Sequence, residues 1–302
     1  MSLILVRCAG EIGTKGRNRK YFVRRLRRNL RAALKAQNVA GKVWSEGQRV
    51  YIQVDDEDDD PAIDALQRVF GVSSISPVRR VAADLETIRA TALELAEQID
   101  LQPPATFRVQ TRRADKSFPH ISPEVSRRVG GAIQKATQAA VDLSDETDVT
   151  IGIEIRIEGA MVFGQIIPGP GGMPIGTQGR VFVLMSGGID SPVAAWQMMR
   201  RGCGIIPIHF AQSEKERDKA LENCRTLGQW SYGWQIKPLV LDHEQVMRPI
   251  VQRLRELGSG SGEEDFQTAA DAVRLGASHL NAEPSADPRR QIYRAIRNAR
   301  RD

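Results

Sequence analysis

The hydrophobic positions of the first 80 residues switch between strand-like and helix-like spacing. Residues 3–8 alternate between apolar and polar side chains and predict a strand, whereas residues 18–36 repeat apolar side chains at a helical period. Further along, the pattern predicts strands around Val43 and at 50–54, a helix over 62–70 that Pro61 opens, and a strand over 72–78. The order β-α-β-β-α-β is typical of a ferredoxin-like unit of about 75 residues.

The rest of the chain predicts a second α+β unit and then a parallel α/β unit. For the second unit, the pattern predicts a helix over 84–99, a strand over 106–111, a helix over 124–141, and a hairpin of 149–157 with 161–166 that turns at Glu158 and Gly159. Glycine and proline crowd residues 168–180 and predict a linker. After it follow a strand over 181–185, a helix over 192–201 and a strand over 204–210. We therefore expect domains at 1–75, 76–167 and 181–302.

Basic charge is concentrated in the first of these domains. Residues 1–54 hold 13 Lys or Arg and 2 Asp or Glu, and no acidic residue occurs between Ile12 and Ser45. On the helix of residues 18–36, Phe22, Leu26 and Leu30 would face the core, with Val23 and Leu34. The basic side chains Arg24, Arg27, Arg28, Arg31 and Lys35 would share the other face. A row of basic side chains suits binding to a nucleic-acid phosphate backbone without selectivity for particular bases. A basic helix that is only solvated explains the pattern equally well.

Composition narrows the class of protein further. The chain has 302 residues, of which 41% are hydrophobic and 26% charged, an ordinary balance for a folded protein. It contains no apolar run long enough to cross a bilayer, and its strand-like start does not resemble a signal peptide. The three cysteines, Cys8, Cys203 and Cys224, are too scattered for a disulfide scaffold or a zinc site. We therefore expect a cytoplasmic protein without a protein-bound metal.

One loop carries the clearest chemical signal. Residues 186–192 read Ser-Gly-Gly-Ile-Asp-Ser-Pro and lie between a predicted strand and a predicted helix. The two glycines allow close approach of the backbone to an anion, the hydroxyls of Ser186 and Ser191 add donors, and Pro192 suits the start of a helix. The loop is not a Walker A motif. Asp190 is poorly suited to bind phosphate, and would orient the loop or help to hold Mg²⁺. A glycine turn without a ligand is the alternative.

The loop resembles the PP-loop of ATP pyrophosphatases, and two longer stretches narrow the resemblance. These are PGPGGMPIGTQGRVFVLMSGGIDSPVA at residues 168–194, and VRCAGEI at 6–12 with KGRNR at 15–19 and Phe22. Both are similar to the tRNA 4-thiouridine synthetase (tRNA sulfurtransferase) family. The resemblance implies a ferredoxin-like domain, a THUMP RNA-binding domain and a PP-loop domain with a parallel sheet, and it covers about residues 1–250.

The resemblance also implies a reaction and its partners. Uridine O4 at tRNA position eight would attack the α-phosphate of ATP, with Mg²⁺ present, and a persulfide sulfur would then displace AMP. A cysteine desulfurase would supply that sulfur, and a thiamine-pathway sulfur-carrier protein would be a second acceptor; a homodimer is left open.

The residues that the resemblance and the loop assign fall into three groups. The catalytic group is Ser186, Asp190 and Ser191. The nucleotide-binding group is Leu184, Met185, Ser186, Gly187, Gly188, Asp190, Ser191, His209 and Phe210, in which His209 could equally be a core histidine at a strand end. The RNA-binding group is Lys15, Arg17, Arg19, Lys20, Arg24, Arg27, Arg28, Arg31, Arg112, Arg113 and Lys116.

The last part of the sequence departs from the family. Beyond Arg255 it lacks the Gly-rich Leu-Gly-Gln stretch, of which residues 275–278 are a faint echo, and a cysteine in a Tyr-Cys-Gly context. Residues 258–262 predict a flexible linker, and residues 283–302 a basic tail or short helix that is solvated or contacts RNA. No cysteine has an identified base, so burial is the simpler reading of all three, with Cys224 the weak choice for a redox role. A non-catalytic tRNA-binding protein and a PP-loop ligase acting on a small molecule are the competing functions.

Overall fold

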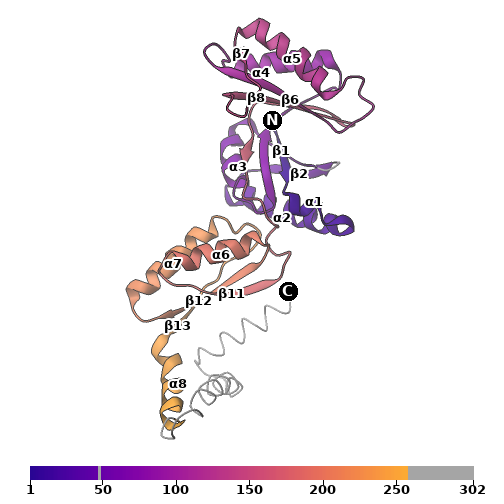
Figure 1. The fold of residues 1–302 in the computed structure, drawn as a ribbon. Helices are drawn as coiled ribbons and strands as arrows, with labels where there is room; N and C mark the ends of the chain where they lie inside the picture. Colours follow the sequence, from indigo (N-terminus) through magenta and orange to yellow (C-terminus); the bar gives the residue numbers. More distant parts are fainter. Residues whose placement is uncertain (47–48, 258–302) are drawn as a thin grey trace. The chain divides into compact units, whose positions relative to one another are not determined.

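The structure, a computed structural model, describes residues 1–46 and 49–257. It divides into two compact units, Met1–Pro174 and the part that begins at Ile175 (Figure 1). The segments predicted at residues 258–262, 275–278 and 283–302 lie outside the described residues. Among the helices that are described, none is both long enough and apolar enough to cross a bilayer.

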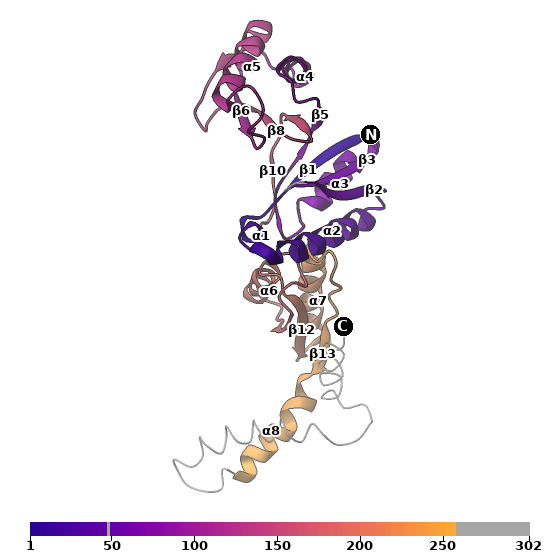
Figure 2. The ribbon, with the colours of Figure 1, turned by 90° about the vertical axis from the view of Figure 1, so that its right-hand side faces the viewer.

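The first unit begins with an antiparallel sheet of five strands in the order β10-β4-β1-β3-β2. Its strands are β1 (Ser2–Cys8), β2 (Gly41–Glu46), β3 (Arg49–Val54), β4 (Val72–Pro77) and β10 (Ile167–Pro168). The helical segments are α1 (Gly10–Gly13), η1 (Gly16–Asn18), α2 (Arg19–Ala36), η2 (Asp56–Asp58) and α3 (Asp59–Leu66). Helices α2 and α3 pack side by side (Figure 2). The expected ferredoxin-like order is confirmed, with the four-residue helix α1 as an addition that the pattern was too short to reveal.

The apolar face of α2 holds this first core together. Leu26 and Leu30 are fully buried, Phe22 and Leu34 are nearly so, and Val23 is half-buried. Each such side chain contributes about 1.5–3 kcal/mol through burial. Two basic side chains of the helix also bind the edge strand β2, because Arg27 and Arg31 donate to the carbonyl of Val43 at 3.2 and 2.7 Å.

A second sheet with the order β5-β9-β8-β6-β7 completes the first unit. Its strands are β5 (Arg79–Val81), β6 (Thr106–Arg113), β7 (Ala140–Val141), β8 (Val149–Arg156) and β9 (Gly159–Phe163), and its helices are α4 (Leu85–Gln98) and α5 (Ser122–Thr137). Strand β6 runs parallel to β7 and β8, while β8 and β9 form the predicted antiparallel hairpin. The two helices lie side by side over a core that includes Ile88, Phe107, Val129 and Ile153 (Figure 1).

Two expected segments of the first unit differ from the structure. The helix predicted over 124–141 ends at Thr137, because Gln138 adopts a left-handed conformation (φ 60°) and Ala140 and Val141 then pair with β6. The segment predicted as a linker is partly ordered, since β10 pairs with β4 and the amides of Gly169 and Gly171 donate to Ser73 and Val72. A Cβ at Gly169 would lie 2.5 Å from the Val72 carbonyl oxygen, so this close approach requires glycine.

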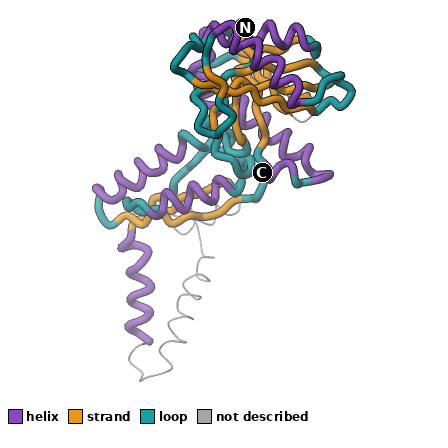
Figure 3. Tube along the Cα trace, turned by 45° about the horizontal axis from the view of Figure 1, so that its top comes forward, coloured by secondary structure: helices purple, strands orange, loops and turns teal. Residues whose placement is uncertain are grey.

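The second unit contains a parallel sheet of three described strands in the order β11-β12-β13. Its elements are β11 (Arg180–Leu184), α6 (Asp190–Arg200), β12 (Gly204–Ala211), α7 (Glu214–Gly228), β13 (Leu239–Asp242) and α8 (His243–Leu257). Helices α6 and α7 contact each other and β12, and cover one face of the sheet (Figure 3). The expected parallel α/β architecture is confirmed.

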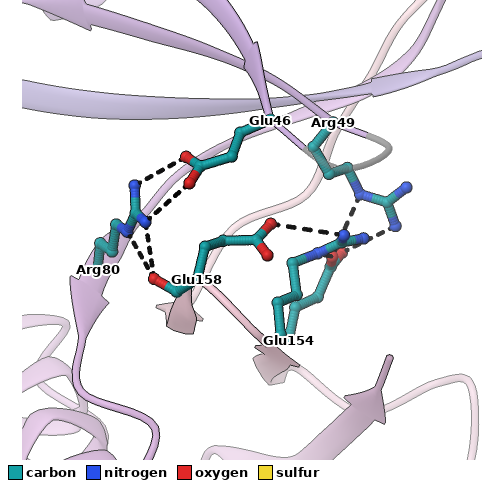
Figure 4. A network of polar contacts seen from close by, with 6 residues as sticks. Glu46, Arg49, Arg80, Glu154 and Glu158 are labelled. Carbon is teal, nitrogen blue, oxygen red and sulfur yellow. Dashed lines mark hydrogen bonds and ion pairs between the residues drawn. The ribbon is translucent and has the colours of Figure 1, made fainter. Parts of the chain in front are cut away.

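A buried carboxylate joins the two sheets of the first unit (Figure 4). Glu154 on β8 is only 4% exposed and binds three guanidinium groups, those of Arg7 on β1, Arg49 on β3 and Arg156 on its own strand, at 2.9, 3.2 and 3.4 Å. Arg80 on β5 adds a second link, to Glu46 on β2 at 3.1 Å. Burial acts to raise the pKa of Glu154, but Arg49 and Arg7 outweigh burial and hold that pKa below its ordinary value.

Removing this charge should weaken the first unit. Glu154→Gln leaves Arg7 and Arg49 without their carboxylate partner, while Arg156 keeps only Glu158 at 3.7 Å. We therefore expect the free energy of unfolding at pH 7 to fall by about 3–5 kcal/mol in urea titrations of the full chain. Glu94→Gln, which breaks the exposed pair with Arg79, is the control and should cost under about 1 kcal/mol. Because the folded-state pKa of Glu154 is depressed, its contribution is present above the unfolded-state pKa and disappears as pH falls through the folded-state pKa. A deficit that stays constant from pH 7 down to pH 3 would contradict this account.

Candidate nucleotide site and basic surface

The Gly-rich loop crosses the carboxyl ends of two parallel strands. In the register of β11 with β12, Leu184 is paired with Ile208, and the next amide, of Met185, donates to the Ile208 carbonyl at 2.8 Å. Residues 185–189 then lead into α6. Because parallel strands end at the same edge, the loop lies beside His209 and Phe210, near the end of β12.

Two serines hold the loop closed. The Ser191 hydroxyl on the first turn of α6 accepts from the Ser186 amide at 2.9 Å and lies 3.1 Å from the Ser186 hydroxyl. The Ser186 hydroxyl in turn accepts from the Gly188 amide at 3.2 Å. Both side chains therefore stabilise the conformation of the loop through hydrogen bonds, which is a structural role in addition to any contact with a ligand.

Helix α7 supports the loop from behind. The Asn223 side-chain amide donates to the carbonyls of Ser186 and Gly188, at 3.0 and 3.1 Å. A Cβ at Gly187 would lie 2.9 Å from the Cβ of Lys219, so the backbone of the loop rests directly on this helix. Glycine at this position is therefore required by close packing.

Two backbone amides of the loop have no hydrogen-bond partner among the described residues. Among the described residues, no group accepts from the amides of Gly187 and Ile189, and the N-terminus of α6 has no side-chain cap. Free N–H groups at the positive end of a helix attract an anion. The arrangement can therefore bind a phosphate or a pyrophosphate.

His209 forms the buried wall next to the loop. It is 6% exposed, and its Nδ1 lies 2.8 Å from the carbonyl oxygen of Met185. Since a carbonyl only accepts, the ring donates from Nδ1, and Nε2 presents a lone pair when the ring is neutral. Nε2 is buried and has no hydrogen-bond partner among the described residues.

A pocket of about 590 Å³ opens between these elements. Seven of the nucleotide-binding residues expected from the sequence line it, namely Leu184, Met185, Ser186, Gly187, Gly188, His209 and Phe210. Asp190 and Ser191 lie beside the pocket, on the first turn of α6. The lining also includes Ile208, Gln212, Glu216 and Lys219, which the sequence analysis missed. Lys219 is exposed and forms no ion pair with the described acidic residues, so its positive charge is available.

In the part of the chain that is described, no group of three or more His, Cys, Asp or Glu side chains could hold a metal ion. Two isolated carboxylates lie at the loop: Asp190 on the first turn of α6 and Glu216 in the lining of the pocket.

The basic residues expected to contact RNA form two groups in the first unit. The first group lies on η1 and α2, where Lys15, Arg17, Lys20, Arg24 and Arg28 are exposed. Burial, and secondarily the neighbouring Arg28, lowers the pKa of Arg25 on the same helix. Arg19 is half-buried, and Arg27 and Arg31 bind Val43 as described.

The second group lies at the end of β6. Arg112 and Lys116 are exposed there, whereas Arg113 donates to the carbonyls of Phe118 and His120 at 2.8 and 3.1 Å and so shapes the following loop. The exposed members of both groups remain candidates for phosphate contacts, and the three arginines bound to carbonyls also have structural roles.

None of the three cysteines has the environment of a reactive thiol. Burial raises the pKa of Cys8, Cys203 and Cys224. Cys224 borders a separate pocket of about 390 Å³ together with Trp234 and Ile236. A raised pKa keeps a thiol protonated and slow to react.

Family models match three successive parts of the chain. The model described as ThiI ferredoxin-like domain matches residues 3–76, the THUMP domain matches residues 82–163, and the model described as Thiamine biosynthesis protein (ThiI) matches residues 176–259. A ferredoxin-like domain, a THUMP domain and a ThiI domain in this order define a ThiI-type protein.

Curated relatives and solved structures agree with this class. A "Probable tRNA sulfurtransferase" from Brevibacillus brevis is 42% identical over 233 residues, which is 77% of this chain and 57% of the relative. A relative with the same name from Thermococcus kodakarensis is 38% identical over 263 residues, which is 85% of this chain and 68% of the relative. The chain belongs to the tRNA sulfurtransferase (ThiI) family, as its sequence motifs predicted. It spans a little over half the length of the Brevibacillus brevis relative.

Two solved structures share the fold. The crystal structure of PH1313 from Pyrococcus horikoshii has a TM-score of 0.69 and 31% identity, and the match covers 85% of this chain and 84% of that one. A crystal structure of a 4-thiouridine synthetase–RNA complex with bound ATP has a TM-score of 0.69 and 30% identity, with coverage of 84% and 65%.

The raised thiol pKa values predict slow alkylation. At pH 7.5, iodoacetamide should label Cys8, Cys203 and Cys224 about tenfold more slowly than it labels glutathione, because less thiolate is present and access is restricted. Mass spectrometry of tryptic peptides measures each site. In urea all three sites should react at the rate of a free thiol. Rapid labelling of Cys224 in the folded protein would instead identify it as an activated thiol.

Proposed function

We propose that this protein uses ATP to activate a uridine of tRNA and exchanges its O4 for sulfur, giving 4-thiouridine at position 8. The observation that carries the proposal is the pocket of about 590 Å³, whose lining combines the Gly-rich loop and Lys219 with the apolar side chains of Leu184, Met185 and Phe210. The names of the curated relatives and the ATP-bound 4-thiouridine synthetase structure support it.

The pocket would bind the two parts of ATP, its phosphates and its adenine, in two different regions. Phosphates would bind the amides of Gly187 and Ile189 and the ammonium of Lys219, because free N–H groups at a helix N-terminus and a cation both attract an anion. Adenine would lie against Leu184, Met185 and Phe210. Mg²⁺ would enter as part of the substrate, on the phosphates of ATP, with Asp190 as the nearest carboxylate of the loop.

The proposed reaction begins with adenylation. Uridine O4 attacks the α-phosphorus, the bond to the bridging oxygen breaks, and pyrophosphate leaves. The loop amides stabilise the charge that develops on this leaving group. Because burial raises the pKa of the three described thiols, the sulfur atom would arrive as a persulfide on a partner, a cysteine desulfurase. Its terminal sulfur would attack C4 and AMP would leave. A second thiol would then attack the inner sulfur, which releases 4-thiouridine and leaves a disulfide. The thiamine name of the matching family model favours a sulfur-carrier protein as a second acceptor.

The tRNA would bind the exposed basic side chains of the first unit. Arg17, Lys20, Arg24 and Arg28 present cations without a described acidic neighbour, which suits phosphate contacts. THUMP-type recognition of a folded acceptor arm would then depend on shape and phosphate positions.

ATP binding and turnover test the proposal directly. Isothermal titration should show ATP binding to the full chain, and Lys219→Ala should weaken it about tenfold by removing one charge-assisted contact. Lys215→Ala, on the same helix but outside the pocket lining, is the control and should bind ATP as the wild type does.

With a tRNA transcript, the wild type should release AMP and pyrophosphate. Asp190→Ala should not release them, while its affinity for tRNA stays nearly unchanged.

The competing function makes a different prediction in the same experiment. A non-catalytic tRNA-binding protein would retain tRNA without binding ATP. Absence of a titration signal for ATP would therefore refute the proposed enzyme and favour the binding protein.

The tRNA interface should show a measurable salt dependence. The double variant Arg24→Ala/Arg28→Ala should reduce the slope of log affinity against log salt by about 2, because two phosphate contacts are lost. Fluorescence anisotropy with labelled tRNA at several salt concentrations measures this slope. Arg89→Ala on α4 is the control, since Arg89 pairs with Glu86. Equal slopes for the wild type and the double variant would exclude this face of α2 from the interface.

A further inference from the structure

The side chain of Asn223 binds two peptide groups of the Gly-rich loop. Its single Nδ2 group donates both of its hydrogens, to the carbonyls of Ser186 at 3.0 Å and Gly188 at 3.1 Å. Asn223 lies on α7, 35 and more residues away in sequence, and is half-buried against the loop. The sequence analysis assigned it no role.

These two contacts fix the direction of two amides. A trans peptide is planar, so its C=O and its N–H point in opposite directions. The Ser186 carbonyl shares a peptide group with the Gly187 amide, and the Gly188 carbonyl shares one with the Ile189 amide. The amides of Gly187 and Ile189 are the loop donors without a partner among the described residues. Holding both carbonyls against α7 therefore turns both free N–H groups away from that helix.

Because the loop contains glycine, the direction of its peptide groups has to be fixed by another residue. A peptide group next to glycine can rotate at little steric cost, so residues 186–189 could also present carbonyl oxygens to the pocket. Such oxygens carry negative partial charge and would repel a phosphate. The Asn223 amide removes that alternative, and an asparagine suits the task because its NH₂ group offers two donors where an aspartate offers none.

We propose that Asn223 is a positioning residue of the nucleotide site, which orients the Gly187 and Ile189 amides toward the phosphates of ATP. This inference rests on the proposed function, because it assumes that the pocket binds a nucleotide. It assigns to α7 a part in phosphate binding that is separate from the charge of Lys219. Asn223 itself does not touch the ligand.

The test compares ATP with adenosine, which lacks phosphates. Asn223→Leu removes both donors and keeps a side chain of similar size, so titration calorimetry with the full chain should show an ATP affinity about tenfold weaker. The affinity for adenosine should not change. Asn223→Asp has nearly the same shape without the donors and should lose at least as much ATP affinity. Thr226→Leu, an exposed site one turn further along α7, is the matched control and should leave both affinities unchanged.

Each outcome distinguishes the inference from the proposed function. If wild type and Asn223→Leu bind ATP equally well, the inference is wrong and the proposed function stands. An equal loss for ATP and adenosine would mean that Asn223 only supports the fold of the pocket, which also overturns the inference. If the wild type binds neither ligand, the proposed function fails and the inference fails with it. Should Asn223→Leu not fold, the same comparison with Asn223→Asp decides.

Discussion

The parallel register between β11 and β12 is the constraint on which the candidate site depends. It places the end of one strand beside the end of the other, so that Met185 binds the Ile208 carbonyl and its own carbonyl binds His209. The loop after β11 and the helix after β12 must then meet at the same edge. From this single geometrical fact follow the position of the pocket, the close packing of Gly187 on α7 and the contacts of Asn223.

This register also explains which site residues the sequence could predict. Leu184, Gly187 and Gly188 belong to a motif with its own strand–loop–helix context, and His209 and Phe210 follow a strand of the same type. Lys219 and Asn223 could not be predicted, because periodicity along α7 reports its buried side, made of Ala220, Cys224 and Leu227, and says nothing about what its other sides contact. Contacts between segments 30 residues apart require the fold.

In the first unit, too, the pattern of charged and hydrophobic residues could predict some features of the structure and not others. The basic positions of α2 could be found from the sequence, but not that Arg27 and Arg31 bind a carbonyl of β2 while Arg24 and Arg28 remain exposed. The predicted helix over 124–141 continued too far because Ala139 is buried and extends the apolar pattern, whereas the left-handed Gln138 leaves no trace in it. The Glu154 cluster was equally hidden, since its members come from β1, β3 and β8. That cluster links one sheet of the first unit to the other through ion pairs.

The short strand β10 has a consequence for synthesis of the chain. It borders β4 in the first sheet, yet it comes from residues 167 and 168, after the whole second sheet. While the ribosome is still producing residues 78–166, the outer edge of β4 has no neighbour, and an open strand edge invites pairing with other nascent chains. A fragment cut after β4 would keep that edge permanently and tend to aggregate. The first domain of this protein is therefore finished only when the translation of its second domain is complete.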